Sequence, residues 1–131
     1  MNPSQLLLLL LTLIGLLPMN TFAEDLRPVT VALQTPHPGF SLRIERVVRK
    51  EGALLVLARV TPPQGEGLMF PMVISEIEDT VQVAADAEIP VRSFVVGRTW
   101  GWDDERVTAL EAEAAFDALA EGGDALPLQR P

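Results

Sequence analysis

The sequence predicts a mainly β protein with one C-terminal helix, an α+β fold. We expect a mainly antiparallel sheet of five or six strands, either curled into a half-barrel or folded into a sandwich, with the helix packed on it. Short apolar or alternating segments recur between Pro- and Gly-rich turns from residue 29 to residue 97. A later segment, residues 104 to 121, is rich in Ala, Glu and Leu. The length of 131 residues suits a single domain.

The N-terminus has the composition of a secretory signal peptide. The apolar run from Leu6 to Leu17 is shorter than the ~20 residues of a membrane-spanning helix, and the small residue Ala23 follows it. We expect cleavage after Ala23, a signal peptide at residues 1–23, one β-rich domain at residues 24–131, and a periplasmic or secreted location. Because no Lys or Arg precedes the apolar run, a retained N-terminal anchor is the alternative.

Residues 40 to 61 predict a β-hairpin. Residues 40–45 alternate between apolar and polar side chains, which is typical of a strand with one buried face. A turn with charged residues and a glycine follows, and residues 53–61 are apolar on both faces, as in a central strand. The residues expected to face the core from the first strand are Phe40, Leu42 and Ile44.

Further strands are expected on both sides of this hairpin. Residues 68–75 are apolar but contain Pro71, which predicts an edge strand or a strand broken at the proline. The acidic segment at residues 76–79 is expected to be a turn. The remaining strand candidates, chosen for β-branched residues and alternation, are residues 29–34, 80–83 and 91–96.

The single predicted helix spans residues 104–121, which contain no glycine or proline. Three acids at residues 103–105 are suited to capping its N-terminus, and the glycines at residues 122–123 are suited to ending it. The apolar stripe of this helix consists mostly of alanines. We expect it to pack on the sheet through Phe116 and Leu119.

The composition excludes several classes of function. Eighteen acids against ten bases leave a net charge of -8, the wrong sign for binding nucleic acid. The chain has no cysteine, which rules out disulfides, thiol nucleophiles and cysteine zinc sites. The one histidine, His37, lies between two prolines and is expected to face solvent. No serine lies in a nucleophile motif. We therefore expect no catalytic, cofactor-binding or metal-binding residues and no cofactor.

The two tryptophans form the strongest candidate for a binding site. Trp100 and Trp102 flank one glycine and are followed by Asp103 and Asp104. Large amphipathic rings beside charges are enriched at protein interfaces. The alternative is that one ring closes the core between the last strand and the helix. We expect these four residues to contact a partner protein of basic or amphipathic character.

The segment from residue 38 to residue 83 carries a recognisable order of features. A glycine and an aromatic residue at 39–40 begin an alternating strand, and a charged turn, an apolar strand and a Pro/Gly loop at 62–67 follow. Two short strands come next, at 68–75 and 80–83. This pattern resembles the C-terminal domain of the protease complex subunit PrcB family. The resemblance implies an exported β-rich domain that associates with a secreted subtilisin-like protease, and it implies no catalytic residue.

Three classes of function follow from these observations. The first is an exported, non-catalytic accessory or interaction protein, which associates with a secreted protease or another envelope protein. The second is a small-ligand-binding domain, which a pocket lined by Phe, Met and Trp would favour. The third is a carboxylate-based hydrolase, which would depend on Asp103, Asp104 or Glu78. A protein partner is expected, whereas nucleic acid binding and stable membrane insertion after signal removal are not.

Overall fold

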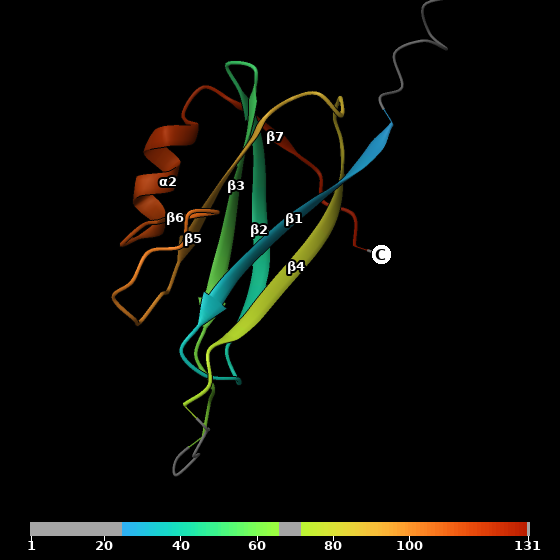
Figure 1. The fold of residues 1–131 in the computed structure, drawn as a ribbon. Helices are drawn as coiled ribbons and strands as arrows, with labels where there is room; N and C mark the ends of the chain where they lie inside the picture. The colour runs from blue at the N-terminus through green and yellow to red at the C-terminus, as the bar shows by residue number, and fades with distance from the viewer. Residues whose placement is uncertain (1–24, 66–71, 131) are drawn as a thin grey trace, which may run out of the picture.

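The computed structural model describes residues 25–65 and 72–130 and shows the predicted fold class, mainly β with one short helix (Figure 1). The signal peptide expected at residues 1–23 lies outside the described residues. Within the part of the chain that is described, no helix has the length and apolar character needed to cross a bilayer. In chain order the elements are β1 (Leu26–Thr35), β2 (Ser41–Lys50), β3 (Ala53–Thr61), β4 (Ser75–Ala84), β5 (Val91–Val96), β6 (Thr108–Ala109), α2 (Glu113–Ala120) and β7 (Asp124–Leu126).

The strands form two sheets, and the helix forms a third layer (Figure 1). Strands β1 and β4 make an antiparallel ribbon, paired from Leu26↔Ala84 to Thr35↔Ser75. The other five strands form one sheet in the order β6-β5-β3-β2-β7. The ribbon packs on one face of this sheet and α2 on the other. Of the two predicted forms, the arrangement is therefore an open sandwich.

The five-stranded sheet is mixed, whereas the sequence predicts a mainly antiparallel one. Strand β5 pairs with β3 in parallel, from Leu54↔Val91 to Arg59↔Val96, and β6 pairs with β5 in parallel. The cause is that β4, which follows β3 in the chain, pairs with β1 in the ribbon and not with β3. The chain then crosses back from the ribbon and enters beside β3 in the same direction.

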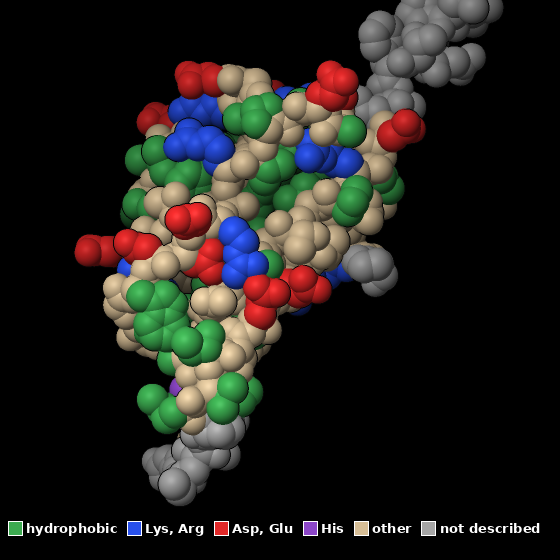
Figure 2. Space-filling model, in the orientation of Figure 1, with side chains coloured by type: hydrophobic (Ala, Val, Ile, Leu, Met, Phe, Trp, Pro, Cys, Tyr) green, Lys and Arg blue, Asp and Glu red, His purple; other side chains and the backbone are tan. Residues whose placement is uncertain are grey.

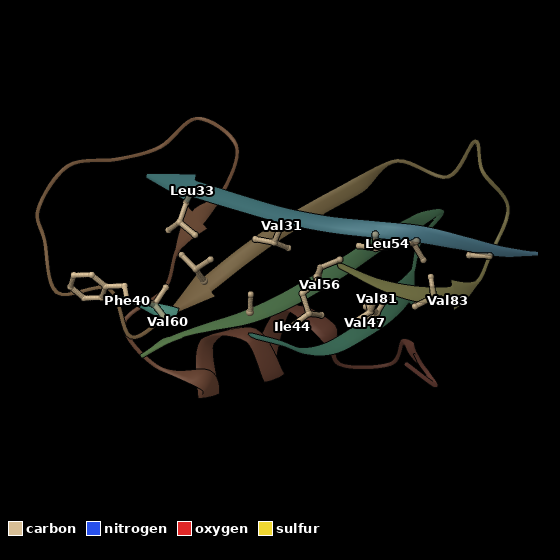
Figure 3. Close-up of a cluster of buried hydrophobic side chains, with 14 residues drawn as sticks. Val31, Leu33, Phe40, Ile44, Val47, Leu54, Val56, Val60, Val81 and Val83 are labelled. Atoms are coloured by element: carbon tan, nitrogen blue, oxygen red, sulfur yellow. The ribbon is translucent and has the colours of Figure 1, made fainter. Parts of the chain in front are cut away.

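The main core lies between the ribbon and the five-stranded sheet (Figure 3). Along β1, Val29 and every second residue after it are buried. Strand β3 is buried on both faces, because Val56 belongs to this core and Leu57 to a second cluster under the helix. This confirms the predicted central position of the strand. The inward-facing residues predicted for the first strand of the hairpin, Phe40, Leu42 and Ile44, all belong to this core or pack against it.

The β2–β3 hairpin is confirmed, and it contains two irregularities. Its tip is a two-residue turn at Glu51 and Gly52, both with positive φ (51° and 77°), as the twist of a short hairpin requires. A bulge interrupts β2 between Ile44 and Arg46. Because of this bulge, Ile44 and Val47 both face the core although they are three residues apart.

Strand β4 corrects the turn predicted at residues 76–79, which lie inside this strand. Ile77 pairs with Leu33 and packs against the core, whereas Glu76 and Glu78 are exposed. The two glutamates therefore occupy the solvent face of a regular strand, whereas Asp79 on the other face accepts from the Ile44 amide. The three acidic residues favour a turn, but the apolar and polar alternation around Ile77 is typical of the strand that forms.

The structure also differs from the strand predicted at residues 68–75. The strand begins only at Ser75, and residues 72–74 are exposed and outside any strand. Ser75 already pairs with Thr35, the last residue of β1, so the residues before it have no partner in the ribbon. Residues 68–71 lie outside the described residues.

The helix is shorter than the predicted span of residues 104–121. Helix α2 covers only Glu113–Ala120, and Ala112 at its N-cap has extended backbone and no side-chain capping bond. The three acids at residues 103–105 therefore do not cap it. The predicted C-terminal stop is confirmed, because Gly122 has φ 80°.

Residues 104–110 form a turn and a short edge strand because other groups satisfy their backbone. The Arg106 amide donates to the Asp104 carboxylate at 3.0 Å, and the Leu110 amide donates to the Val95 carbonyl at 2.8 Å. These bonds replace the i to i−4 bonds of a helix. Pairing with the exposed edge of β5 thus overrides a high helix propensity.

Helix α2 packs through Phe116 and Ala120, which are buried. The Phe116 ring meets Phe94 of β5 edge to face at a centroid distance of 6.0 Å. Leu119, the second residue predicted to pack, is instead 40% exposed. It lies at the rim of a hollow beside the helix and not over the sheet.

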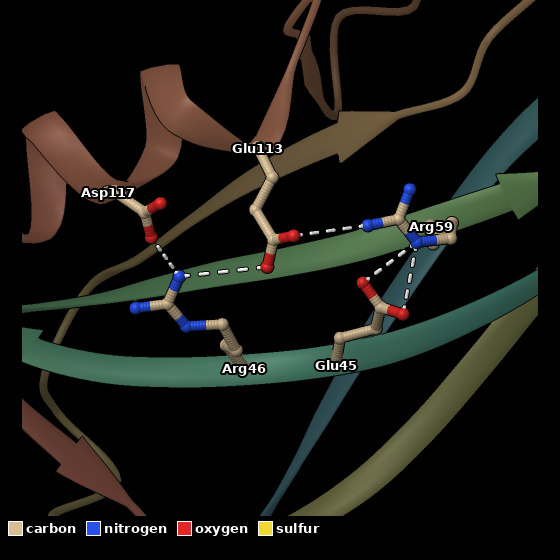
Figure 4. A network of polar contacts seen from close by, with 5 residues as sticks. All are labelled: Glu45, Arg46, Arg59, Glu113 and Asp117. Atoms are coloured by element: carbon tan, nitrogen blue, oxygen red, sulfur yellow. Dashed lines mark hydrogen bonds and ion pairs between the residues drawn. The ribbon is translucent and has the colours of Figure 1, made fainter.

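Ion pairs add a polar connection between helix and sheet (Figure 4). Arg46 on β2 contacts Asp117 and Glu113 of the helix, the latter at 3.8 Å. Glu113 also reaches Arg59 on β3 at 3.4 Å, and Arg59 binds both carboxylate oxygens of Glu45 at 3.0 and 3.1 Å. The five side chains alternate in charge, so this cluster fixes the helix above the sheet and leaves no cation in it without a carboxylate.

The two sheets share no strand pairing within the described residues. Side-chain hydrogen bonds, which we call the clasp, join the ribbon to β2 instead. The Asp79 carboxylate of β4 accepts from the Ile44 amide at 2.7 Å and from Arg130 at 2.9 Å. Arg130 also donates to the Ile44 carbonyl at 2.9 Å. Next to this clasp, Gln82 and Gln129 form an antiparallel bridge. The C-terminal tail therefore closes one side of the sandwich.

Candidate functional site

A series of ring contacts links the turn after β1 to the loop after β5. The ring centroids of His37 and Phe40 are 4.8 Å apart, those of Phe40 and Trp100 are 5.0 Å apart, and those of Trp100 and Trp102 are 5.9 Å apart. Exposure rises along the series, from buried Phe40 through half-buried Trp100 to Trp102 at 40%. One tryptophan thus closes the core and the other faces solvent.

The backbone that presents Trp102 is held by Arg98. The Arg98 guanidinium donates to the Trp102 carbonyl at 2.6 Å and to the Asp103 carboxylate at 2.9 Å. Its own side chain is largely covered. These two hydrogen bonds therefore fix the loop backbone that carries the exposed ring.

Asp104 anchors the same loop to β1. Its carboxylate accepts from the side chain of Arg106 at 2.9 and 3.0 Å, from the Arg106 amide at 3.0 Å and from the Gln34 amide at 3.1 Å. Its side chain is 13% exposed. Hydrogen bonds from the Arg106 side chain are the main reason that the pKa of Asp104 lies well below its ordinary range, and burial opposes them.

Arg106 connects this anchor to the ribbon. Besides binding Asp104, its guanidinium donates to Glu76 of β4 at 2.6 Å. Hydrogen bonds to these two carboxylates raise the pKa of Arg106 above its ordinary value. The loop is therefore tied to both strands of the ribbon.

Three apolar residues extend the exposed surface. Met72, Val73 and Ile74 are 87%, 56% and 63% exposed, and they immediately precede β4. The pairing of Ser75 with the end of β1 places them at the same end of the molecule as the turn after β1 and the loop after β5 (Figure 1). We call these three residues together with Trp102 the apolar end.

Acidic side chains border the apolar end. Glu76, Asp103 and Glu105 are exposed, and we call them the acidic rim. They line a shallow hollow of about 420 Å³ together with Asp104 and Arg106. Figure 2 shows this zone as red side chains around a blue one, above green side chains at the lower end of the molecule. An apolar surface with a negative border is complementary to a segment that combines apolar and basic residues.

The structure divides the four residues predicted to contact a partner into two pairs. Trp102 and Asp103 are exposed, whereas Trp100 and Asp104 are held against the core and the ribbon. The sequence does not identify the exposed residues 72–74, because the apolar run around Pro71 predicts a strand. The signal that was present is the alternation that starts only at Ser75.

The other candidates from the sequence are His37, Glu78, a metal site and a ligand pocket beside the tryptophans. His37 is partly exposed, packs against Phe40, and its Nδ1 lies 2.7 Å from the Pro38 carbonyl oxygen. Glu78 is exposed on β4. Residues 25–65 and 72–130 contain no group of three or more side chains placed to hold a metal ion. The cavity beside the tryptophans measures about 10 Å³, which is room for about one water molecule.

Comparison of the chain with protein-family models, with curated proteins and with solved structures gives no match.

Proposed function

We propose that this chain is an exported, non-catalytic interaction protein whose apolar end docks on a partner protein. The observation that carries the proposal is the location of most exposed large apolar side chains at one end of the molecule (Figure 1). Six large apolar residues of the described chain are exposed, and four of them form the apolar end. Exposed large apolar residues gathered at one end of a small domain are a feature of interaction sites.

The partner that fits this surface is a protein segment with apolar and basic side chains. Trp102 supplies a large ring on a fixed backbone, which is the type of residue that dominates binding energy at interfaces. The acidic rim supplies attraction for Lys or Arg around it. An exported protease is the first partner class to test, because the family resemblance of residues 38–83 implies one.

The other two classes of function receive less support. A ligand site between the tryptophans would need far more room than the cavity of about 10 Å³ beside them. A hydrolase based on Asp104 would need a carboxyl group that gives up and takes back a proton near neutral pH. The low pKa of Asp104 and its four hydrogen bonds suit an anchor instead.

The test compares capture of partners by the wild type and by two single variants. The chain without residues 1–23 is incubated with envelope and medium fractions from its own cells, and captured proteins are quantified by mass spectrometry. Trp102→Ala should weaken the binding free energy of the true partner by more than about 1 kcal/mol and so lower its capture. Leu26→Ala, which truncates an exposed apolar residue outside the apolar end, is the matched control.

A partner that the wild type and the Leu26 variant capture but the Trp102 variant loses supports the proposal. Added salt should weaken that capture, because the acidic rim attracts the partner through charge. The proposal fails if every captured protein is retained by Trp102→Ala.

A further inference from the structure

A hollow of about 290 Å³ lies at the other end of the five-stranded sheet, between the tip of the β2–β3 hairpin, the start of β5 and helix α2 (Figure 1). Its apolar lining includes Leu55, Phe94 and Leu119. Its charged lining includes Lys50 and Arg92. Since β2 has ten residues, this hollow and the apolar end lie roughly 30 Å apart. The proposed partner site does not use it.

We propose that this hollow binds a small amphiphilic anion, a carboxylate with a short apolar chain. Its volume is close to the lower limit of ligand cavities, which is about 300 Å³. That volume suits a single short chain rather than a membrane lipid with two long ones. The inference stands independently of the partner-binding proposal.

The charge of the hollow is the first argument. The chain carries a net charge of -8, yet two cations line this site against one carboxylate, Glu51. Within residues 25–65 and 72–130, neither Lys50 nor Arg92 has a carboxylate within 4 Å, whereas five arginines of that part do. Two cations that line one hollow with no carboxylate of the described chain within 4 Å are complementary to an anion.

The fixed positions of these cations are the second argument. The Lys50 ammonium donates to the Leu119 carbonyl at 2.8 Å, which leaves two of its three N–H donors for a ligand. The Arg92 guanidinium lies over the Phe94 ring, 5.5 Å from its centroid, and its own N–H donors remain available. Both head groups are therefore placed directly beside apolar side chains.

The apolar lining is the third argument. Leu55 and Phe94 are buried in the sheet, and Leu119 on the helix is 40% exposed at the rim. A short alkyl chain between these three side chains would cover the exposed part of Leu119. This accounts for a large apolar residue on the helix that the core itself leaves uncovered.

Glu51 lines the hollow at the tip of the β2–β3 hairpin. It is the one non-glycine residue of the described chain with positive φ, at 51°. The two-residue turn of the hairpin requires this conformation. The tight turn brings Lys50 to the edge of the hollow, directly before Glu51 in the chain.

The experiment titrates the chain without its signal peptide with octanoate, and follows backbone amide signals by NMR. Octanoate should shift the signals of Phe94 and Leu119 and leave those of Trp102 unchanged. Propionate, which lacks the chain, and 1-octanol, which lacks the charge, should each bind at least tenfold more weakly. Equal affinity for octanoate and 1-octanol, or no shift at saturating octanoate, would overturn the proposal.

Two variants locate the site. Arg92→Gln should weaken octanoate binding at least fivefold, while Arg43→Gln, a matched change at an exposed arginine of β2 that does not line the hollow, should leave it unchanged. Leu119→Asp places a carboxylate in the hollow and should abolish binding. Because these side chains are exposed, the folded state of each variant is checked by its melting temperature. Unchanged affinity in both the Arg92 and Leu119 variants would show that octanoate binds elsewhere.

Discussion

Gly97 decides where strand β5 ends and the loop with the tryptophans begins. Its φ of 89° lies in the region that residues with a side chain rarely adopt. A Cβ atom at this position would also overlap the carbonyl oxygen of Val60 on β3. The strand can turn into the loop because glycine satisfies both requirements.

Gly97→Ala should therefore lower the free energy of unfolding by at least about 2 kcal/mol, from the backbone conformation and the overlap together. Gly101→Ala is the matched control, because a Cβ there meets no atom within 4 Å and the backbone needs no positive φ. Urea denaturation of both variants is the measurement. A Gly97 variant as stable as the Gly101 variant would contradict this account of the strand end.

Asp104 makes stability dependent on pH. Its pKa is lowered in the folded state, so its stabilisation is complete above the ordinary pKa of about 4 and is lost as the pH falls through the folded value. Asp104→Asn should cost about 1–2 kcal/mol near pH 7, and its difference from the wild type should shrink as the pH falls from about 5 to about 2.

Asp103→Asn is the control for that titration, because the Asp103 side chain is 90% exposed. It should change the free energy of unfolding by less than about 0.5 kcal/mol at every pH. A constant gap between Asp104→Asn and the wild type across the acid range would show that the carboxylate charge is unimportant.

At the scale of elements, β1 shows how an edge strand is protected from pairing with other chains. It pairs only with β4, so its other edge is open. Pro28 has no amide hydrogen to present there, and the Gln34 amide is bound by Asp104. The open edge of β1 is therefore limited to the residues between Pro28 and Gln34.

Helix α2 is held by one aromatic side chain more than by its length. Phe116 is fully buried, meets Phe94 and lies under the Arg46 guanidinium, 5.0 Å from its ring centroid. The helix has eight residues, which is too short to be stable without tertiary contacts. Its position therefore depends on this contact and on the ion pairs of Glu113 and Asp117.

Phe116→Ala should cost about 3–5 kcal/mol, because it removes a fully buried ring and leaves a cavity under the helix. Leu119→Ala on the same helix should cost less than about 1 kcal/mol, because that side chain is 40% exposed. Thermal and urea unfolding of the pair provide the measurement. Equal losses in the two variants would indicate that the helix packs through the originally predicted stripe.

At the scale of the whole molecule, the two sheets are joined by the core and by the C-terminal clasp. Asp79 and Arg130 satisfy both backbone groups of Ile44, at the residue where the β2 bulge begins. Burial raises the pKa of Asp79, but the hydrogen bonds from Arg130 and the Ile44 amide outweigh it and leave the pKa below its ordinary value. The clasp is therefore a paired, charged contact and not an isolated buried acid.

Arg130→Ala should destabilise the whole sandwich by about 1–2 kcal/mol, because it removes two hydrogen bonds from the Asp79 and Ile44 clasp. Hydrogen exchange should also become faster in β4, which the clasp holds against β2. Arg43→Ala, at an exposed position of β2, should leave both quantities nearly unchanged. Protection in β4 that is the same in the variant and the wild type would contradict the role of the clasp.

Local patterns in the sequence were sufficient for the elements whose partners are nearby or whose burial is complete. The hairpin over residues 40–61 is confirmed, because alternation and turn residues act within a few positions. The strand at residues 91–96 is confirmed to the residue. The fold class, mainly β with one helix, also follows from apolar patterning together with one Ala-rich segment.

Tertiary structure alone decided the features that depend on distant partners. Residues 108–109 became a strand because β5 offered an open edge, and residues 76–79 became a strand because β1 offered a partner. The division of the tryptophans was decided in the same way, because Trp100 meets Phe40 sixty residues earlier in the chain while Trp102 meets solvent. Sequence patterns report which side chains can be buried, but the neighbours that fold beside them determine which of them are.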